Sequence, residues 1–231
     1  MTIKGYNKED IARRVAAELQ PDWVVNVGIG MPLTVLPFVP AERDIIFHSE
    51  NGIIGMGPEL ADPTLGDDDL LSAGKRPVTL IPGGCFVHHA DSFALARNGR
   101  LDATLLGAYQ VSESGDLANW RLPSAELGSI GGAMDLAVGA KRVLVLMTHV
   151  GSDGTPKIVK TISYPLTAQR CVTKIFTDLA VISVTSAGLV LEEIAPGLTI
   201  EDVQGVTEPK LIPGERLQFR SKESGPKSVA L

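Results

Sequence analysis

Short apolar segments alternate with segments of helical period along most of the chain, and this alternation limits the possible folds. The predicted helices cover residues 8–19, 90–97 and 133–138. Parallel strands joined through helices are buried on both faces, so their sequences are continuous apolar runs. The sequence therefore predicts an α/β fold with an open, mostly parallel sheet and flanking helices. The predicted strands are residues 23–27, 44–47, 78–81, 101–106, 143–147 and 179–184.

The first predicted helix has a clear beginning and a clear buried face. Ile11, Val15 and Leu19 recur at intervals of four residues, which places them on one side of a helix. Asn7 precedes this stripe and suits the N-cap position, where its side chain can accept a hydrogen bond from the first turn. The pattern predicts an amphipathic helix that packs on the sheet.

Size and charge narrow the classes of protein to consider. The 231 residues can bury a full core, which we place in residues 1–213, and the polar residues 214–231 predict a mobile C-terminal tail. The net charge of −6 and the scattered lysines and arginines do not indicate nucleic-acid binding. Cys85 and Cys171 are interpreted as reduced core residues. Because no apolar run reaches membrane-spanning length, we expect a cytoplasmic protein that does not bind membranes.

One acidic residue, Glu50, stands between a predicted strand and a loop that contains Gly52 and Gly55. A carboxylate at the end of a strand, next to backbone without side chains, can approach a ligand closely. Such a group could act as the nucleophile in acyl transfer if water is excluded and the oxyanion is bound. Without its neighbours, a surface acid at the end of a strand would be the favoured interpretation of this residue.

The segment Ser49-Glu50-Asn51-Gly52, continued by residues 53–58, resembles the active-site signature of the family I CoA-transferases. It is most similar to the beta subunits of the 3-oxoacid CoA-transferases, and the resemblance runs from about residue 7 to about residue 212. Several ordered motifs together are more specific than any one of them. The other segments that resemble the family are residues 25–32, 69–75, 107–111, 115–120, 131–136 and 164–167.

The resemblance implies a mechanism and a site. Glu50 would attack an acyl-CoA, form an acyl-glutamyl anhydride, and then carry CoA as a glutamyl thioester in ping-pong catalysis. Ser49 and Asn51 would lie at the same pocket. The family uses coenzyme A esters as substrates and needs no metal or redox cofactor, so none is expected here.

Two pairs of glycines are candidates for the substrate pocket. Gly28 and Gly30 follow a predicted strand, but the third glycine of a dinucleotide fingerprint would fall at Leu33, so that pattern fails. They form either a tight turn or a loop that lines the acyl pocket. Gly131 and Gly132 precede a predicted helix and could donate backbone N–H groups to an oxyanion. The resemblance favours Gly132 for that contact, and close backbone packing is the alternative.

Several cationic or titratable residues are candidates for contacts with CoA or with the acid substrate. His88 and His89 could suggest a metal site, but no further His or Cys spacing supports one. A pocket wall or a helix cap is the favoured interpretation of these histidines. The complete set of candidate CoA or acid contacts is Lys75, Arg97, Arg121, His88 and His89.

Two departures from the family pattern bear on the acid substrate. Residues 121–128 lack two lysines that many members carry there, and residues 86–93 resemble the branch that acts on 3-oxoadipate. We therefore expect succinyl-CoA as the donor and 3-oxoadipate as the acceptor. Acetoacetate is the alternative acceptor, and hydrolysis of an acyl-CoA by the same glutamate is the alternative reaction.

The resemblance also implies a partner. The chain matches only the beta half of a family whose complete members also have an alpha half. We expect a homologous alpha subunit that forms a heterodimer or an α2β2 assembly with this chain. A purely regulatory CoA-binding subunit is a third interpretation, and the intact motif around Glu50 disfavours it.

Overall fold

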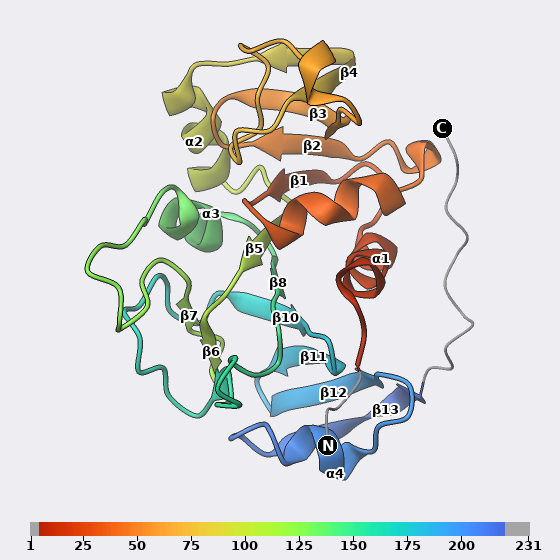
Figure 1. Ribbon diagram of the computed structural model, residues 1–231, viewed down its shortest axis with the longest axis vertical. Coiled ribbons are helices and arrows are strands. Elements are labelled where there is room, and N and C mark those ends of the chain that lie inside the picture. The colour runs from red at the N-terminus through yellow and green to blue at the C-terminus, as the bar shows by residue number, and fades with distance from the viewer. Residues whose placement is uncertain (1–4, 220–231) are drawn as a thin grey trace.

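The computed structural model describes residues 5–219, which form one large sheet with helices on both sides (Figure 1). The α-helices are α1 (Lys8–Glu18), α2 (His89–Arg97), α3 (Ala133–Gly139) and α4 (Ile200–Gln204), and the 3-10 helices are η1 (Met31–Phe38), η2 (Ala41–Arg43) and η3 (Pro63–Leu65). The strands are β1 (Val24–Val27), β2 (Ile46–Ser49), β3 (Ile53–Glu59), β4 (Val78–Phe86), β5 (Ala103–Gly107), β6 (Gln110–Ser112), β7 (Leu117–Ala118), β8 (Val143–Leu146), β9 (Ile158–Val159), β10 (Val172–Phe176), β11 (Ala180–Thr185), β12 (Gly188–Ile194) and β13 (Leu211–Phe219).

The large sheet has ten strands in the order β13-β12-β11-β10-β8-β5-β1-β2-β3-β4. The central block from β10 through β8, β5 and β1 to β2 is parallel throughout. The predicted α/β class with a mostly parallel sheet is therefore confirmed. Strands β6, β7 and β9 form a separate small sheet, which the sequence did not predict because each has only two or three residues.

Antiparallel pairs flank the parallel block on both sides, and the edge strand β13 then joins β12 in parallel. Strand β3 pairs with β2 and with β4 in antiparallel fashion, and β11 does so with β10 and β12. Short connections account for the β2–β3 and β11–β12 pairs, whereas the longer segment 60–77 joins β3 to β4. Residues 50–52 separate β2 from β3, and residues 186–187 separate β11 from β12. Connections this short can only form hairpins, whereas a parallel crossover needs a dozen residues or more.

Alternate residues of the central strands pack on opposite faces of the sheet. In β8, Leu144 and Leu146 belong to the core under α1 and η1, whereas Val143 and Val145 belong to the core on the other face. All four are fully buried, as expected for a strand covered on both sides. Figure 1 shows α1 on the right of the central strands and α2 with α3 on the left.

Helix α1 begins at the predicted cap and is fastened to the far end of the chain. The Asn7 side chain accepts a hydrogen bond from the Asp10 backbone N–H, and the Asp10 side chain accepts one from the Asn7 backbone N–H. Arg14 forms an ion pair with Glu193 of β12, and the Tyr6 hydroxyl donates to the same carboxylate at 2.6 Å. The Arg14 guanidinium also lies over the Tyr6 ring, 3.5 Å from its centroid. One carboxylate thus joins the first helix to a strand that lies 179 residues beyond Arg14 in the sequence.

Two expectations need correction. The predicted boundary at residue 213 falls inside β13, which continues to Phe219 and pairs there with Ile194, so residues 214–219 are not a mobile tail. The rest of the predicted tail, 220–231, lies outside the described residues. Cys85 is exposed because β4 is the edge strand of the sheet, whereas Cys171 is half-buried. Within residues 5–219, no helix is both long and apolar enough to cross a bilayer.

Candidate active site

Glu50 lies at the turn that leaves β2 and enters β3. Gly52 closes this turn by donating its backbone N–H to the Ser49 carbonyl at 3.0 Å. Gly52 has a φ of +113°, and a Cβ there would lie 2.4 Å from the Val87 carbonyl oxygen. Only glycine fits both conditions, because other residues are strained at positive φ and would collide with that oxygen. The glycine after the acid is therefore required by the shape of the turn.

The position of Glu50 is the one at which α/β sheets usually bind ligands. It follows the carboxyl end of β2, and the neighbouring β1 ends at Val27, just before the loop 28–30. Strand β5, on the other side of β1, ends at Gly107. All three ends meet at one edge of the sheet, where ligand-binding crevices of open α/β folds occur. The sheet thus gathers segments that are far apart in the sequence around one carboxylate.

The Glu50 carboxylate faces the segment that precedes α3. The Gly132 backbone N–H donates a hydrogen bond to it, and the charge of His89 acts on it from the start of α2. Burial raises the pKa of Glu50 above its ordinary value, and these two groups oppose that rise. A raised pKa makes a carboxylate a better nucleophile once it is ionised. The structure therefore brings Gly132 and His89 to Glu50, and Gly131 lies there too, since a Cβ on it would be 3.9 Å from Glu50 Oε1.

Gly132 is packed too closely for any larger residue. A Cβ there would lie 2.4 Å from the Phe93 ring atom Cζ and 2.5 Å from Glu50 Oε2. The neighbouring Gly131 has a φ of +49° and more room. In this conformation the Gly132 N–H binds the carboxylate of Glu50. Its predicted contact with a substrate oxyanion stays a prediction.

Ser49 and Asn51 hold a second loop against the nucleophile. The Ser49 hydroxyl accepts a hydrogen bond from the Ala73 N–H at 3.0 Å, and the Asn51 amide donates to the Leu71 carbonyl at 2.7 Å. Both side chains therefore bind the loop formed by residues 71–75, which also contains Lys75 in an exposed turn with a φ of +59°. They fix the walls of the site, and the sequence alone did not reveal this role.

The Gly28–Gly30 loop contains one tight backbone contact and one open position, and its predicted place in the acyl pocket stays a prediction. Gly28 forms a tight contact, because a Cβ there would lie 2.6 Å from the Leu105 carbonyl oxygen, to which its N–H donates at 2.9 Å. Gly30 has a φ of +85° with open space around it, and Ile29 between them is 62% exposed. A Cβ on Gly74 would contact Ile29 at 3.7 Å, so the loop lies beside residues 71–75.

The candidate cations and histidines each have a further contact in the structure. Arg97 forms two hydrogen bonds with the Asp135 carboxylate, at 2.8 and 3.1 Å, which join α2 to α3. His88 caps α2, since its Nδ1 accepts from the Ala90 N–H at 3.2 Å. His89 instead packs on Phe93, with ring centroids 4.8 Å apart. The remaining candidate, Arg121, donates from Nε to the Ala125 carbonyl at 3.3 Å.

Sequence reasoning missed a row of polar residues buried behind Glu50. Asn26 of β1, His48 of β2 and Thr104 of β5 face one another across the sheet, and all three are fully buried. Ser92 of α2 is equally buried and continues the row. Asn26 and Thr104 each interrupt an otherwise apolar segment, which is a signal that could have revealed them. Their alignment depends on strand register, which the sequence does not give.

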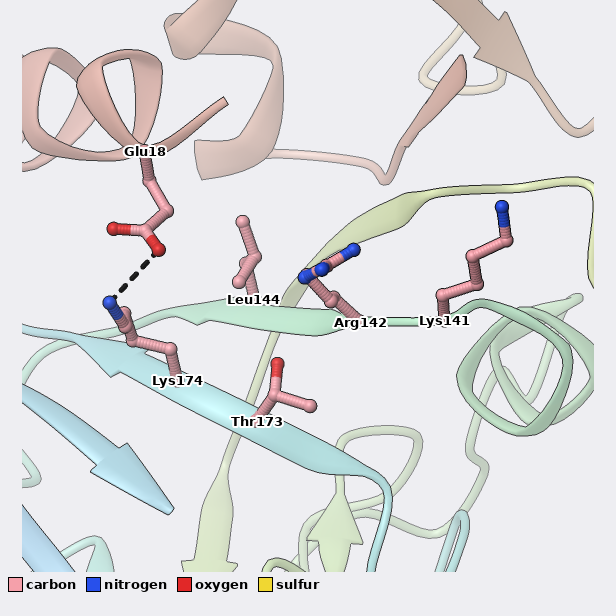
Figure 2. Close-up of a pocket in the computed structure, with 6 residues that line it drawn as sticks. All are labelled: Glu18, Lys141, Arg142, Leu144, Thr173 and Lys174. Atoms are coloured by element: carbon pink, nitrogen blue, oxygen red, sulfur yellow. Dashed lines mark hydrogen bonds and ion pairs between the residues drawn. The ribbon is translucent and has the colours of Figure 1, made fainter. Parts of the chain in front are cut away.

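A cavity of about 410 Å³ lies at the opposite end of the strands from Glu50. Figure 2 shows the residues that line it. Lys141 and Arg142 precede β8, and Lys174 lies near the start of β10, so these cations are at the amino ends. Lys174 pairs with Glu18 at 2.9 Å and with Glu192, and Lys141 pairs with Asp102 at 2.7 Å. Arg142 stacks over Trp23. This cavity is therefore separate from the Glu50 site. No cluster of potential metal ligands occurs among residues 5–219.

Comparison with known proteins finds a family and relatives that match most of the chain. Residues 8–205 match the model of the family described as coenzyme A transferase. The beta subunit of 3-oxoadipate CoA-transferase from Acinetobacter baylyi is 46% identical over 92% of this chain and 98% of that protein, and the protein of that name from Pseudomonas putida is 47% identical over 92% and 100%. Human mitochondrial succinyl-CoA:3-ketoacid coenzyme A transferase 2 is 45% identical over 85% of this chain, which spans only 38% of the human protein.

Solved structures share the fold. An acyl-CoA transferase (YdiF) from Escherichia coli O157:H7 matches with a TM-score of 0.73 at 20% identity, over 96% of this chain and 44% of that one. Glutaconate coenzyme A-transferase from Acidaminococcus fermentans matches with a TM-score of 0.72 at 16% identity, over 97% and 92%. Since the family model covers most of the chain and relatives above 45% identity span it, the chain belongs to the coenzyme A transferase family.

Proposed function

We propose that this chain is the beta subunit of a CoA-transferase in which Glu50 is the covalent nucleophile. The observation that carries the proposal is the environment of the Glu50 carboxylate, which is partly buried and next to the Gly132 N–H. The near full-length similarity to the beta subunits of 3-oxoadipate CoA-transferases supports it. Burial disfavours the charged form of a carboxylate, and groups perturbed in this way cluster at functional sites.

The proposed reaction consists of two symmetrical halves. Glu50 attacks the thioester carbonyl carbon, the carbon–sulfur bond breaks, and an acyl-glutamyl anhydride and CoA thiolate result. The thiolate attacks the Glu50 carbonyl carbon of the anhydride, which releases the first acid and leaves a glutamyl-CoA thioester. The acceptor carboxylate then attacks this thioester, and the freed thiolate takes the acceptor acyl group, which restores Glu50. Each step only exchanges acyl bonds, so the scheme is balanced without an oxidant or reductant.

An alpha subunit completes this enzyme in our proposal. The chain spans 44% of the YdiF chain and 38% of the human relative, so those longer proteins contain additional sequence of about the same length or more. The relatives of full-length similarity are themselves named as single subunits of an enzyme. The purified single chain should therefore lack transferase activity, and adding the alpha subunit should restore it.

Exposed apolar side chains mark a surface for this partner. The segment before and within α3, which contains Gly131 and Gly132, exposes three of them: Leu127 at 85%, Ile130 at 43% and Met134 at 44%. Such side chains favour a partner surface. Full transferase activity of the single chain would reject the assembly.

The proposed substrates are succinyl-CoA and 3-oxoadipate. Unlike acetoacetate, 3-oxoadipate carries a second carboxylate, which needs a cation or several hydrogen-bond donors in the pocket. His89 lies close enough to Glu50 to affect its pKa and is therefore the first candidate, with Arg121 as the second. Arg97 is already paired with Asp135. The values of kcat/KM for 3-oxoadipate and acetoacetate, measured on the assembled enzyme, test this choice. A preference for acetoacetate would reject the substrate and retain the reaction class.

The decisive test of the nucleophile is Glu50→Gln in the assembled enzyme. The amide keeps the shape and removes the nucleophilic charge, so kcat should fall at least about a thousandfold, or roughly 4 kcal/mol of barrier. Borohydride should reduce the thioester and label Glu50 alone in the wild type. Parallel double-reciprocal lines with two substrates would separate transfer from hydrolysis, since a hydrolase ignores the second acid. Near-normal transfer by the Gln variant would rule out the covalent role.

A further inference from the structure

A continuous row of buried hydrogen bonds runs across the sheet and ends on the backbone of Glu50. The Thr104 hydroxyl lies 3.0 Å from Asn26 Oδ1, and Asn26 Nδ2 lies 2.9 Å from His48 Nδ1. His48 Nε2 lies 2.8 Å from the Ser92 hydroxyl, which lies 2.8 Å from the Glu50 carbonyl oxygen. The four side chains before Glu50 are fully buried. The row therefore joins three strands and α2 to the nucleophile.

The direction of every hydrogen bond in this row is determined. The Asn26 amide nitrogen can only donate, so His48 Nδ1 must accept and its proton must be on Nε2. Nε2 then donates to the Ser92 oxygen, and the Ser92 hydroxyl donates to the Glu50 carbonyl. Burial lowers the pKa of His48 to about 4, which agrees with a neutral ring. No buried side-chain nitrogen or oxygen among the described residues lacks a partner, so the row is complete.

The last hydrogen bond acts where regular structure ends. Strand β2 stops at Ser49, and Glu50 is the first residue of the turn. The Ser92 hydroxyl holds the carbonyl of Glu50, and with it the peptide from which the catalytic side chain projects. Ser92 and Phe93 are neighbours in α2, and the Phe93 ring lies against Gly132, the donor to the Glu50 carboxylate. Helix α2 therefore binds the backbone carbonyl of Glu50 through Ser92 and packs, through Phe93, on the glycine that contacts the Glu50 carboxylate. An error of about 1 Å in such a position can cost about a hundredfold in rate.

We propose that Asn26, His48 and Ser92 are positioning residues, which orient Glu50 for attack on the thioester by holding its backbone carbonyl through an ordered row of hydrogen bonds. This inference rests on the proposed role of Glu50 as the nucleophile. The row touches no reacting atom, so its loss should slow the acylation of Glu50 with little effect on the binding of acyl-CoA.

The chain contains a matched control for burial alone. His149 is a second fully buried histidine, with Nδ1 2.9 Å from the Thr177 hydroxyl and Nε2 2.8 Å from the Thr207 hydroxyl. Thr207 in turn donates to the Val203 carbonyl of α4. This second row has the same chemistry and no hydrogen bond to Glu50. Removing the hydroxyl from either row should therefore cost comparable stability, and only the first row should affect catalysis.

The experiment compares Ser92→Ala with Thr207→Val in the complex with the alpha subunit. Rapid quenching with borohydride measures the rate at which glutamyl-CoA forms at Glu50, and steady-state kinetics give KM for the acyl-CoA. We expect Ser92→Ala to slow acylation at least about tenfold, with KM changed by less than about threefold, and Thr207→Val to keep the wild-type rate. Circular dichroism melts check that both variants fold.

Each outcome has a defined meaning. If the wild type forms no adduct at Glu50, the proposed function fails and this inference fails with it. If the wild type forms the adduct and Ser92→Ala forms it at the same rate, only the positioning role is overturned. Equal slowing by Thr207→Val would also overturn it, since general destabilisation would then explain the effect.

A second pair of variants decides the matter if Ser92→Ala does not fold. His48→Gln retains an N–H donor near the Nε2 position, whereas His48→Met has similar bulk and no donor. The Gln variant should acylate at least about threefold faster than the Met variant at matched stability, and equal rates would reject the proposal. In the wild-type complex, ¹⁵N chemical shifts should show His48 as the neutral Nε2–H tautomer. The Nδ1–H tautomer or the cation would contradict the row as described.

Discussion

Gly132→Ala perturbs the catalytic carboxylate with a single added methyl group. A Cβ at this position would lie 2.4 Å from Phe93 Cζ and 2.5 Å from Glu50 Oε2. Carbon atoms in contact are normally at least about 3.5 Å apart, so the ring or the backbone must move by about 1 Å. The same movement lengthens the hydrogen bond from the Gly132 N–H to Glu50.

Both effects act on the chemical step. Misplacement by about 1 Å, or loss of one oxyanion donor, each costs about a hundredfold in rate, equivalent to about 2.7 kcal/mol of barrier. We therefore expect kcat of the assembled enzyme to fall about a hundredfold or more. The assay is single-turnover formation of glutamyl-CoA, with the melting temperature measured in parallel.

Gly107→Ala provides the matched control for this substitution. Gly107 ends β5 at the same edge of the sheet, but a Cβ there would contact only the Leu146 carbonyl oxygen, at 4.0 Å. This variant should keep the wild-type acylation rate. Unchanged kinetics in a folded Gly132→Ala enzyme would show that this glycine has no part in catalysis and that the close contact relaxes elsewhere.

The remaining predictions concern charge and pH. Burial raises the pKa of Glu50 above 4.5, so ionising this residue costs stability in the folded state. Glu50→Gln should therefore melt at or above the wild-type temperature at neutral pH, and this difference should vanish as the pH falls below 4.5. His48 and His149 have pKa values lowered from 6.5 to about 4, so between these pH values the unfolded state binds more protons than the folded state. The free energy of unfolding should therefore decrease as the pH is lowered from 6.5 to about 4, and it should decrease less steeply in His149→Gln. Arg97→Ala should leave KM for 3-oxoadipate unchanged within about twofold, since this exposed cation already pairs with Asp135; a large rise in KM would restore it as a substrate contact.

The parts of the fold that could be predicted are those in which each strand carries its own signal. Residues 143–147 and 179–184 are continuous apolar runs, and the strands β8 and β11 occupy them almost to the residue. The antiparallel pairs could not be predicted in the same way. A hairpin is distinguished from a crossover by the length of the connection, and that length can be measured only once the strand ends are known. The C-terminal boundary failed because β13 lies at an edge of the sheet and most of its residues are exposed, so this strand resembles a polar tail in sequence.

In the candidate site, too, only the residues marked by their own sequence motif could be predicted. The motif around Glu50 and the glycines before α3 identified the centre of the site, and the structure places Gly132 and His89 beside that glutamate. The pairing of Arg97 with Asp135 could not be foreseen, because it depends on how α2 packs against α3. The buried polar row through His48 was also missed, since its hydrogen-bonded neighbours are 22 to 78 residues apart and meet only through strand register and the packing of α2.

The carboxylate of Glu193 has a consequence for how the chain reaches its native state. Tyr6 and Arg14 both bind it, so the first helix cannot make its final contacts until β12 has been synthesised and has joined the sheet. Contacts across so many residues are slow to form, because a long loop must close before any interaction compensates for the lost entropy. A chain emerging from the ribosome would therefore hold an unfinished N-terminal half, with the apolar stripe of α1 incompletely covered, until nearly all of the protein has been made.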